Sequence, residues 1–148
     1  MNLEGLNLWL KYNNFDCLCD QGENDFEYDD EDEIIYCGTL ADNCEDKFTR
    51  FAKSLGLYRH ADIRTLAFLH ELGHYNTMSY LTKKQELVSA LGKTLINAVP
   101  TFNETIAAIK YFIYYRLPIE KVATEWAVEY ANDHPADLAT IDSFIKED

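Results

Sequence analysis

The sequence predicts an α+β protein that is mostly helical and has a small sheet. Apolar residues recur at helical spacing over most of the chain beyond residue 42, and Gly or Pro interrupts the pattern at several points. The segment 33–38, EIIYCG, is instead a short apolar run closed by glycine, which is typical of a strand. Two histidines four residues apart, His70 and His74, stand on one of the predicted helices.

The length of 148 residues predicts a single domain, 1–148, that is large enough to bury a core. No run of about 18 apolar residues is present, and the first ten residues lack the basic and apolar regions of a signal peptide. We therefore expect a soluble, cytoplasmic protein.

The net charge of -13 repels nucleic-acid phosphates and anionic membrane surfaces, so neither is expected as a partner. Much of this charge lies in the segment 23–33, ENDFEYDDEDE. That segment lacks the spacing of an EF-hand, and we expect a solvated loop.

The N-terminal part begins with a short amphipathic helix within residues 1–20, with Leu3, Leu6 and Leu10 on one side, followed by a turn. The strand at 33–38 is expected at an edge or within a small sheet. A helix from Asp42 to Leu55 follows, with Cys44 on its apolar face, and Gly56 ends it.

The C-terminal part is expected to be entirely helical. After the histidine-bearing helix, Leu87, Leu91 and Leu95 mark a helix that ends before Pro100. The segment Ile106 to Tyr115 is apolar nearly all round and predicts a buried helix. Two more helices open at prolines and span 118–130 and 135–146.

His70, Glu71 and His74 belong to the sequence H-E-L-G-H, which indicates a catalytic zinc site. Both imidazoles share one helix face, and that face continues an apolar stripe, so they should point inward. Zinc binds neutral imidazole and lowers the pKa of a bound water towards 7, and Glu71 would take the proton of that water. Gly73 inside a helix costs about 1 kcal/mol relative to alanine, which predicts a close packing contact.

A catalytic zinc site needs a third protein ligand, and Glu120 is the preferred candidate. On the 118–130 helix the inward stripe is expected at Ile119, Val122, Ala123, Trp126 and Tyr130, with Glu120 on its flank. Glu125 projects to the opposite side, and His60 and His134 remain alternatives. The alternative is that Glu120, in a first helical turn, is not a ligand and only stabilises the helix dipole or caps the helix. The four cysteines lack C-x-x-C spacing, so we expect reduced thiols and no second metal site.

Two segments resemble the ImmA/IrrE-type metallopeptidases, which are common in bacterial and prophage genomes. They are Phe68–Tyr75 (FLHELGHY) and Glu120–Ala127 (EKVATEWA). The resemblance implies a zincin-like fold with a strand beside the active-site helix. It also implies that His70, His74 and Glu120 are zinc ligands and that Glu71 is the general base. Two features depart from the family pattern: the separation of 46 residues between His74 and Glu120 (120 minus 74), and Thr124 where related zincins often have aspartate.

The leading functional prediction is a zinc-dependent peptidase that acts on a peptide or protein substrate. The strand at 34–37 could align an extended substrate by edge pairing. Tyr75, Tyr80 and His134 are candidates for stabilising the oxyanion. Because some relatives act on DNA-binding repressors, the resemblance suggests a regulatory protein as substrate. The alternatives are a non-catalytic regulatory module that keeps the metal-binding fold as a scaffold, and a metal-independent acidic mimic that rests on the charged loop.

Overall fold

The computed structural model describes residues 1–40 and 45–147, and over these it is an α+β structure dominated by helices. The expected helix start at Asp42, and Cys44 with it, lie outside the described residues. The elements are α1 (Leu3–Tyr12), β1 (Leu18–Gln21), β2 (Glu27–Asp29), β3 (Ile34–Cys37), α2 (Glu45–Ser54), α3 (Ile63–Thr77), the 3-10 turn η1 (Met78–Tyr80), α4 (Lys83–Ala98), α5 (Glu104–Tyr114), α6 (Pro118–Asp133) and α7 (Pro135–Lys146).

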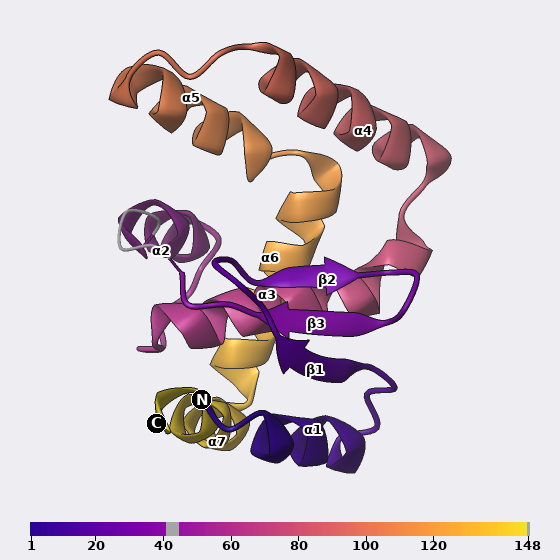
Figure 1. Ribbon diagram of the computed structural model, residues 1–148, viewed down its shortest axis with the longest axis vertical. Coiled ribbons are helices and arrows are strands. Elements are labelled where there is room, and N and C mark those ends of the chain that lie inside the picture. The colour runs from indigo at the N-terminus through magenta and orange to yellow at the C-terminus, as the bar shows by residue number, and fades with distance from the viewer. Residues whose placement is uncertain (41–44, 148) are drawn as a thin grey trace.

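The central feature is the pair of helices α3 and α6, which make the most extensive contact in the described chain. The sheet packs against α3, whereas α1 and α7 lie together at one end of the molecule (Figure 1). Helices α4 and α5 form a hairpin at the opposite end. The main core therefore gathers around α3, and its fully buried side chains include Leu66, Phe68, Leu69 and Leu72.

The sheet has three strands in the order β1-β3-β2, so the strand expected at an edge is in fact central. It pairs in parallel with β1 and antiparallel with β2. Neither flanking strand was expected: β1 lies in the region assigned to a helix and turn, and β2 lies within the acidic segment. Both are short, and β2 exposes charged side chains, so no run of alternating apolar residues marks them.

The outer edge of β1 is closed by a side chain of α1. The amide of Asn7 donates to the carbonyl oxygen of Cys19 at 3.0 Å, and the N–H of Cys19 donates to the Asn7 carbonyl oxygen at 2.7 Å. Asn7 thus occupies backbone groups that another strand would need. The remaining edge of the sheet belongs to β2, which packs beside α3.

Helix α3 begins at the N-cap Asp62, whose side chain accepts a hydrogen bond from the N–H of Arg64 at 2.9 Å. The expected inward stripe is confirmed, because Leu66, Ala67, His70 and His74 are all buried. An apolar face that continues into two imidazoles therefore brings both rings into the interior of the protein.

Gly73 allows α3 to lie directly against α6. A Cβ atom at this position would overlap the carbonyl oxygen of Ala123, which is backbone and has no rotamer with which to move away. The expected packing role of this glycine is confirmed. The close approach also sets the separation of the two helices at the level of His70 and His74.

Replacing Gly73 by alanine should therefore destabilise the fold by about 1–3 kcal/mol, as overpacking does, in spite of the better helix propensity of alanine. Gly92→Ala is the matched control, because the added methyl would meet the flexible side chain of Leu117 rather than backbone. Urea unfolding of the two variants measures the difference. Equal stability of Gly73→Ala and Gly92→Ala would contradict the assigned role of the helix contact.

Helix α6 starts at Pro118, as expected, and its N-terminus is supported by α4. The N–H of Ile119 donates to the Ser89 hydroxyl at 3.1 Å, which satisfies one of the free donors of the first turn. The expected inward stripe was rotated by about one position: Glu120 lies within the buried face instead of on its flank. The other buried residues of this face are Ala123, Thr124, Ala127, Val128 and Ala131.

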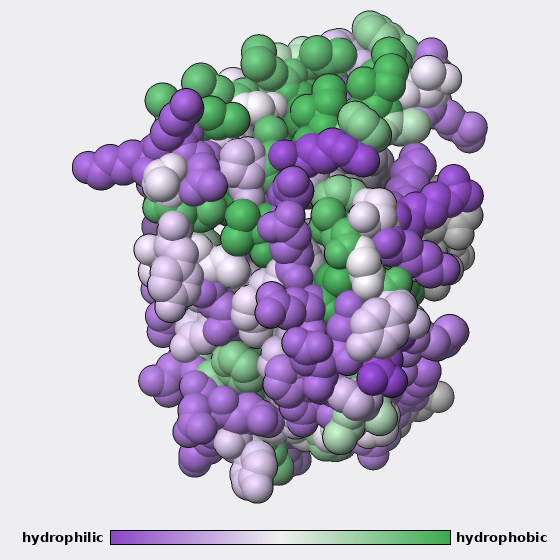
Figure 2. Space-filling model, turned by 180° about the vertical axis from the view of Figure 1, so that it is seen from behind, coloured by the Kyte–Doolittle hydropathy of each residue, from purple (hydrophilic) through white to green (hydrophobic). Residues whose placement is uncertain are grey.

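The segment Ile106 to Tyr115 does form a helix, but the expectation that it is buried was wrong. No residue of α5 is fully buried, and Ile109, Phe112 and Ile113 are exposed. The leucine stripe of α4 is exposed as well, and apolar side chains gather at this end of the molecule (Figure 2). The apolar residues of this segment do lie on a helix, but no other described element covers the outer face of the hairpin.

None of the helices in residues 1–40 and 45–147 combines the length and apolarity needed to cross a bilayer. Cys17, Cys19 and Cys37 are buried free thiols, and burial raises the pKa of Cys17 to about 12. A thiol with so high a pKa stays protonated at neutral pH.

Candidate metal centre

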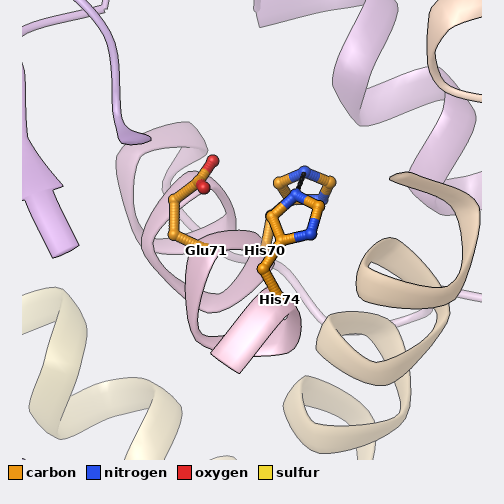
Figure 3. A group of neighbouring side chains, drawn as sticks. All are labelled: His70, Glu71 and His74. Atoms are coloured by element: carbon orange, nitrogen blue, oxygen red, sulfur yellow. Dashed lines mark hydrogen bonds between the residues drawn. The ribbon is translucent and has the colours of Figure 1, made fainter. Parts of the chain in front are cut away.

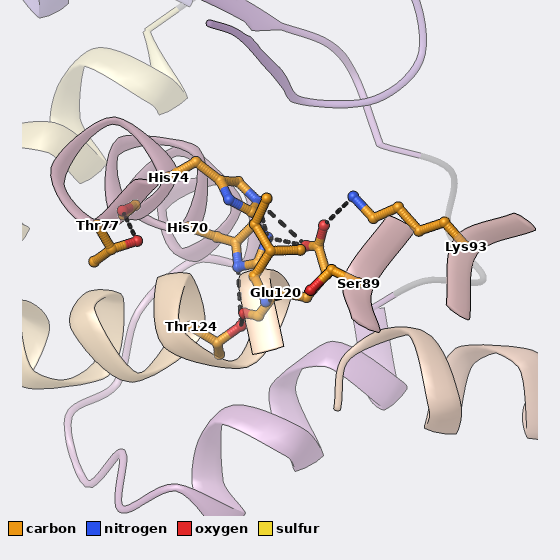
Figure 4. A network of polar contacts seen from close by, with 9 residues as sticks. His70, His74, Thr77, Ser89, Lys93, Glu120 and Thr124 are labelled. Atoms are coloured by element: carbon orange, nitrogen blue, oxygen red, sulfur yellow. Dashed lines mark hydrogen bonds and ion pairs between the residues drawn. The ribbon is translucent and has the colours of Figure 1, made fainter. Parts of the chain in front are cut away.

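Three ligand-type atoms from two helices converge between α3 and α6. The Nε2 atom of His70 lies 2.9 Å from Oε2 of Glu120, and that of His74 lies 3.2 Å from the same oxygen. The two Nε2 atoms are 3.1 Å apart. Figure 4 shows the rings from α3 and the carboxylate from α6 turned toward one another. Glu120 is only 1% exposed, so this is an interior cluster.

The size of the cluster fits a small tetrahedral ion. Zinc bound to imidazole nitrogen and carboxylate oxygen at about 2.0–2.1 Å requires ligand atoms that are about 3.3 Å apart. The three separations of 2.9, 3.1 and 3.2 Å are close to this value. Little movement of the side chains would be needed to hold such an ion.

Thr124 fixes the orientation of the His70 ring. Its hydroxyl donates to the carbonyl oxygen of Glu120 at 2.9 Å and lies 2.9 Å from Nδ1 of His70, so it accepts the Nδ1 proton. The Nε2 lone pair of His70 then points at the carboxylate, another acceptor. Two acceptors that face each other need a proton or a cation between them. Thr124 thus acts as an outer partner that fixes the orientation of the His70 ring.

The electrostatics of the buried ligands are consistent with this donor set. Burial lowers the pKa of His70. The hydrogen bond with Glu120 acts in the opposite direction but is the smaller effect, so the neutral imidazole that binds metals is favoured. For Glu120, burial alone raises the pKa, but hydrogen bonds with His70 and His74 outweigh it and hold the pKa far below its ordinary range. A neutral imidazole and an ionised carboxylate are the forms required of metal ligands.

Glu71 stands beside the two rings and projects from the same side of α3 (Figure 3). Ligand-type atoms of His70, Glu71 and His74 lie within 4.8 Å of one another, so this group could hold a metal ion. The tighter contacts of the rings are with Glu120.

The Glu71 carboxyl group has the environment of a proton acceptor. The removal of water by surrounding protein raises its pKa well above the ordinary value, the negative charge of Glu120 adds to the rise, and a hydrogen bond from the backbone N–H of Tyr28 opposes it. Tyr28 belongs to β2, so the edge of the sheet and helix α3 meet at this carboxyl group. A carboxylate with a raised pKa is a stronger base than an exposed one.

A cavity of about 480 Å³ opens beside the cluster. It is lined by residues of α3, of α5 and of the segment leading into β2. They include His70, Glu71, Tyr111, Tyr114, Phe26 and Glu27. Its walls are mostly apolar and aromatic with a few polar groups, which is the usual composition of a ligand pocket.

Sequence reasoning did not identify Lys93 and Tyr114, which the α4–α5 hairpin brings to the site. The Lys93 ammonium lies 2.8 Å from Oε1 of Glu120. Burial, together with the charge of Glu120, raises the pKa of Tyr114 and keeps its hydroxyl protonated. Lys93 does lie on the α4 face opposite the leucine stripe, with Ser89, but ten tyrosines gave no reason to select Tyr114.

The other candidates named from the sequence lie away from the cluster. His60 and His134 are exposed, and the His134 ring stacks on Tyr130 with 4.1 Å between ring centroids. Glu125 is exposed and lies 3.6 Å from Lys121. Tyr80 and Tyr75 were the other two candidates for stabilising the oxyanion. Tyr80 is 82% exposed, and the Tyr75 hydroxyl accepts a hydrogen bond from the N–H of Asp16.

Comparisons of the chain with protein-family models, with curated proteins and with solved structures find no match. Assignment of a function therefore rests on the residues and their geometry.

Loss of the Glu120 carboxylate should weaken zinc binding far more than loss of the Glu125 carboxylate. Glu120→Ala removes an atom that faces both imidazoles, whereas Glu125→Ala breaks an exposed ion pair. Competition with a chromophoric chelator measures both affinities. We expect a loss of at least about 10-fold to 100-fold for Glu120→Ala, the range found even for outer partners of metal ligands. A larger loss in Glu125→Ala would reverse the assignment.

Proposed function

We propose that this protein is a zinc-dependent metallopeptidase with His70, His74 and Glu120 as zinc ligands and Glu71 as general base. The observation that carries the proposal is the convergence of the three ligand atoms within 3.2 Å, next to the half-buried Glu71 and a cavity. A purely structural zinc site would use four protein ligands, and Glu71 is the further carboxylate near the two histidines; we propose that it serves as the base and leaves the fourth position to water.

Zinc, when bound, would supply Lewis acidity to a water molecule and to the substrate carbonyl. The protein's own residues provide the rest of the chemistry. Glu71 accepts a proton from the attacking water, and the same carboxyl group can return it to the leaving amine. Tyr114 keeps its hydroxyl proton and lines the cavity, so it can donate a hydrogen bond to an oxygen that gains charge.

The outer edge of β2, where the Tyr28 N–H donates to Glu71, is the better candidate for aligning an extended substrate. The earlier choice, β3, is paired on both sides, and Asn7 occupies the edge of β1. Phe26 and Glu27, at the start of β2, line the cavity that contains Glu71. A peptide paired with this edge would pass beside the proton acceptor, with its backbone held by strand hydrogen bonds.

The family proposal follows from the same two segments. The helix with H-E-L-G-H and the helix with E-K-V-A-T-E-W-A pack together, as expected for a zincin-like, ImmA/IrrE-type peptidase. A regulatory protein is the proposed substrate, on the strength of that resemblance. Thr124 in contact with His70 supports the resemblance at a position where the residue type differs.

The test is a search for cleavage by the zinc-loaded protein in a mixture of unfolded proteins and peptides, with new termini identified by mass spectrometry. Cleavage that disappears when a chelator removes zinc, and returns when zinc is restored, supports the proposal. An absence of cleavage by fully loaded protein would favour the non-catalytic metal-binding module.

A further inference from the structure

The two oxygens of the Glu120 carboxylate have different partners. Oε2 lies 2.9 Å from His70 Nε2 and 3.2 Å from His74 Nε2, whereas Oε1 lies 2.8 Å from the ammonium of Lys93. Figure 4 shows Lys93 reaching from α4 to the side of the carboxylate that faces away from the rings. One oxygen is therefore directed at the metal-binding cluster and the other at a cation.

Several contacts hold Lys93 in this position. The Ser89 hydroxyl, one turn earlier on α4, donates to the Gln85 carbonyl oxygen at 2.8 Å and accepts the N–H of Ile119 at 3.1 Å. Gly92 lets α4 approach Leu117, just before α6 begins. The Lys93 ammonium also lies 5.4 Å from the centre of the Tyr114 ring, at a distance suited to a cation–π contact.

We propose that Lys93 is a positioning residue that makes Glu120 a one-oxygen ligand of the metal. This inference rests on the zinc site of the proposed function. Lys93 binds Oε1 by a charge-assisted hydrogen bond and leaves Oε2 to the cluster. It also places a positive charge beside a ligand set that contains a buried carboxylate. Both effects reduce the electron donation of Glu120 and keep a coordination position open.

Removal of Lys93 would leave Oε1 without this partner in a site where Glu120 is 1% exposed. The Tyr114 hydroxyl also hydrogen-bonds the Glu120 carboxylate, but it carries no charge, so Oε1 should turn toward the remaining cation, the metal. The structure thus assigns Lys93 a role that differs from that of a surface ion pair. Its loss should change both metal affinity and the number of ligand atoms.

The test compares Lys93→Met, which keeps the length of the side chain and removes its charge, with Lys93→Arg, which keeps the charge. Lys84→Met on the exposed face of the same helix is the control. Ser89→Ala loosens the contact of α4 with α6 and leaves the charge in place. Thermal unfolding of each metal-free variant identifies those that are folded, and chelator competition then gives their zinc affinities.

Cobalt(II) provides a readout that a merely structural role would not change. Its visible absorption is strong when four atoms coordinate it and weaker when five or six do. We expect Lys93→Met to bind zinc about 10-fold more tightly, because a positive charge beside the site is removed and Oε1 becomes available to the metal, and to give a weaker cobalt spectrum. Lys93→Arg, Ser89→Ala and Lys84→Met should keep the spectrum of the unmodified protein.

An unchanged zinc affinity and cobalt spectrum in Lys93→Met would overturn this inference and leave the peptidase proposal intact. A spectrum altered equally by Ser89→Ala would also overturn it, because helix docking rather than charge would then be responsible. A failure of the unmodified protein to bind zinc or cobalt would remove the proposed function together with this inference.

Discussion

Glu71→Gln should retain zinc and the fold but lose peptide hydrolysis by a factor of at least about 10². Glutamine has nearly the same size as glutamate and can still accept the hydrogen bond from the N–H of Tyr28 through its carbonyl oxygen. It cannot take a proton from water. Steady-state cleavage of a substrate from the screen gives the rate, and elemental analysis gives the zinc content.

Glu125→Gln is the matched control for this loss, since Glu125 is an exposed glutamate of α6 whose partner in the structure is Lys121. Its activity should equal that of the unmodified protein. Hydrolysis that survives Glu71→Gln, with zinc fully bound, would eliminate the mechanism in which Glu71 is the general base.

The double variant His70→Ala/His74→Ala should lose its metal altogether. We expect about one zinc per chain in the unmodified protein, because the described residues contain this one candidate cluster. Removal of two of its three ligands leaves a single carboxylate, which binds zinc poorly in competition with water. Zinc content after dialysis should therefore fall from about one per chain to near zero.

The other two histidines provide the control, since both His60 and His134 are exposed and lie outside α3. His60→Ala/His134→Ala should keep its zinc. A metal that binds only the native state at 1,000 times its dissociation constant adds about 4.1 kcal/mol of stability. Zinc should accordingly raise the melting temperature of the control variant and not that of His70→Ala/His74→Ala. Full zinc retention in the latter would place the metal elsewhere.

The parts of the fold that could be predicted from sequence are those with strong local signals. The histidine-bearing helix combines an N-cap Asp62, a long apolar stripe and a motif that is contained in one turn. Pro118 and Pro135 mark the starts of α6 and α7 directly, because proline is favoured in a first turn. His70, Glu71 and His74 were identifiable because their geometry is set by a single helix.

The remaining features depend on contacts between distant segments. β1 and β2 are short and polar. They are strands because they pair with β3, and their own residue pattern does not indicate a strand. Lys93 is 27 residues from Glu120 (120 minus 93), and its role depends on how α4 docks on α6. The buried face of α6 was misplaced because Glu120 and Thr124 are polar residues that occupy interior positions. Only their partners on α3 make this burial acceptable.

The α4–α5 hairpin has a consequence for the evolution of such sites. The ligands of the cluster belong to α3 and α6, which pack directly through Gly73 and Ala123, and the hairpin between them occupies one end of the molecule. Its length can therefore vary by insertion or deletion while the distance between the ligands stays the same. The spacing of 46 residues between His74 and Glu120 follows from the length of this hairpin, and it carries no information about the geometry of the cluster.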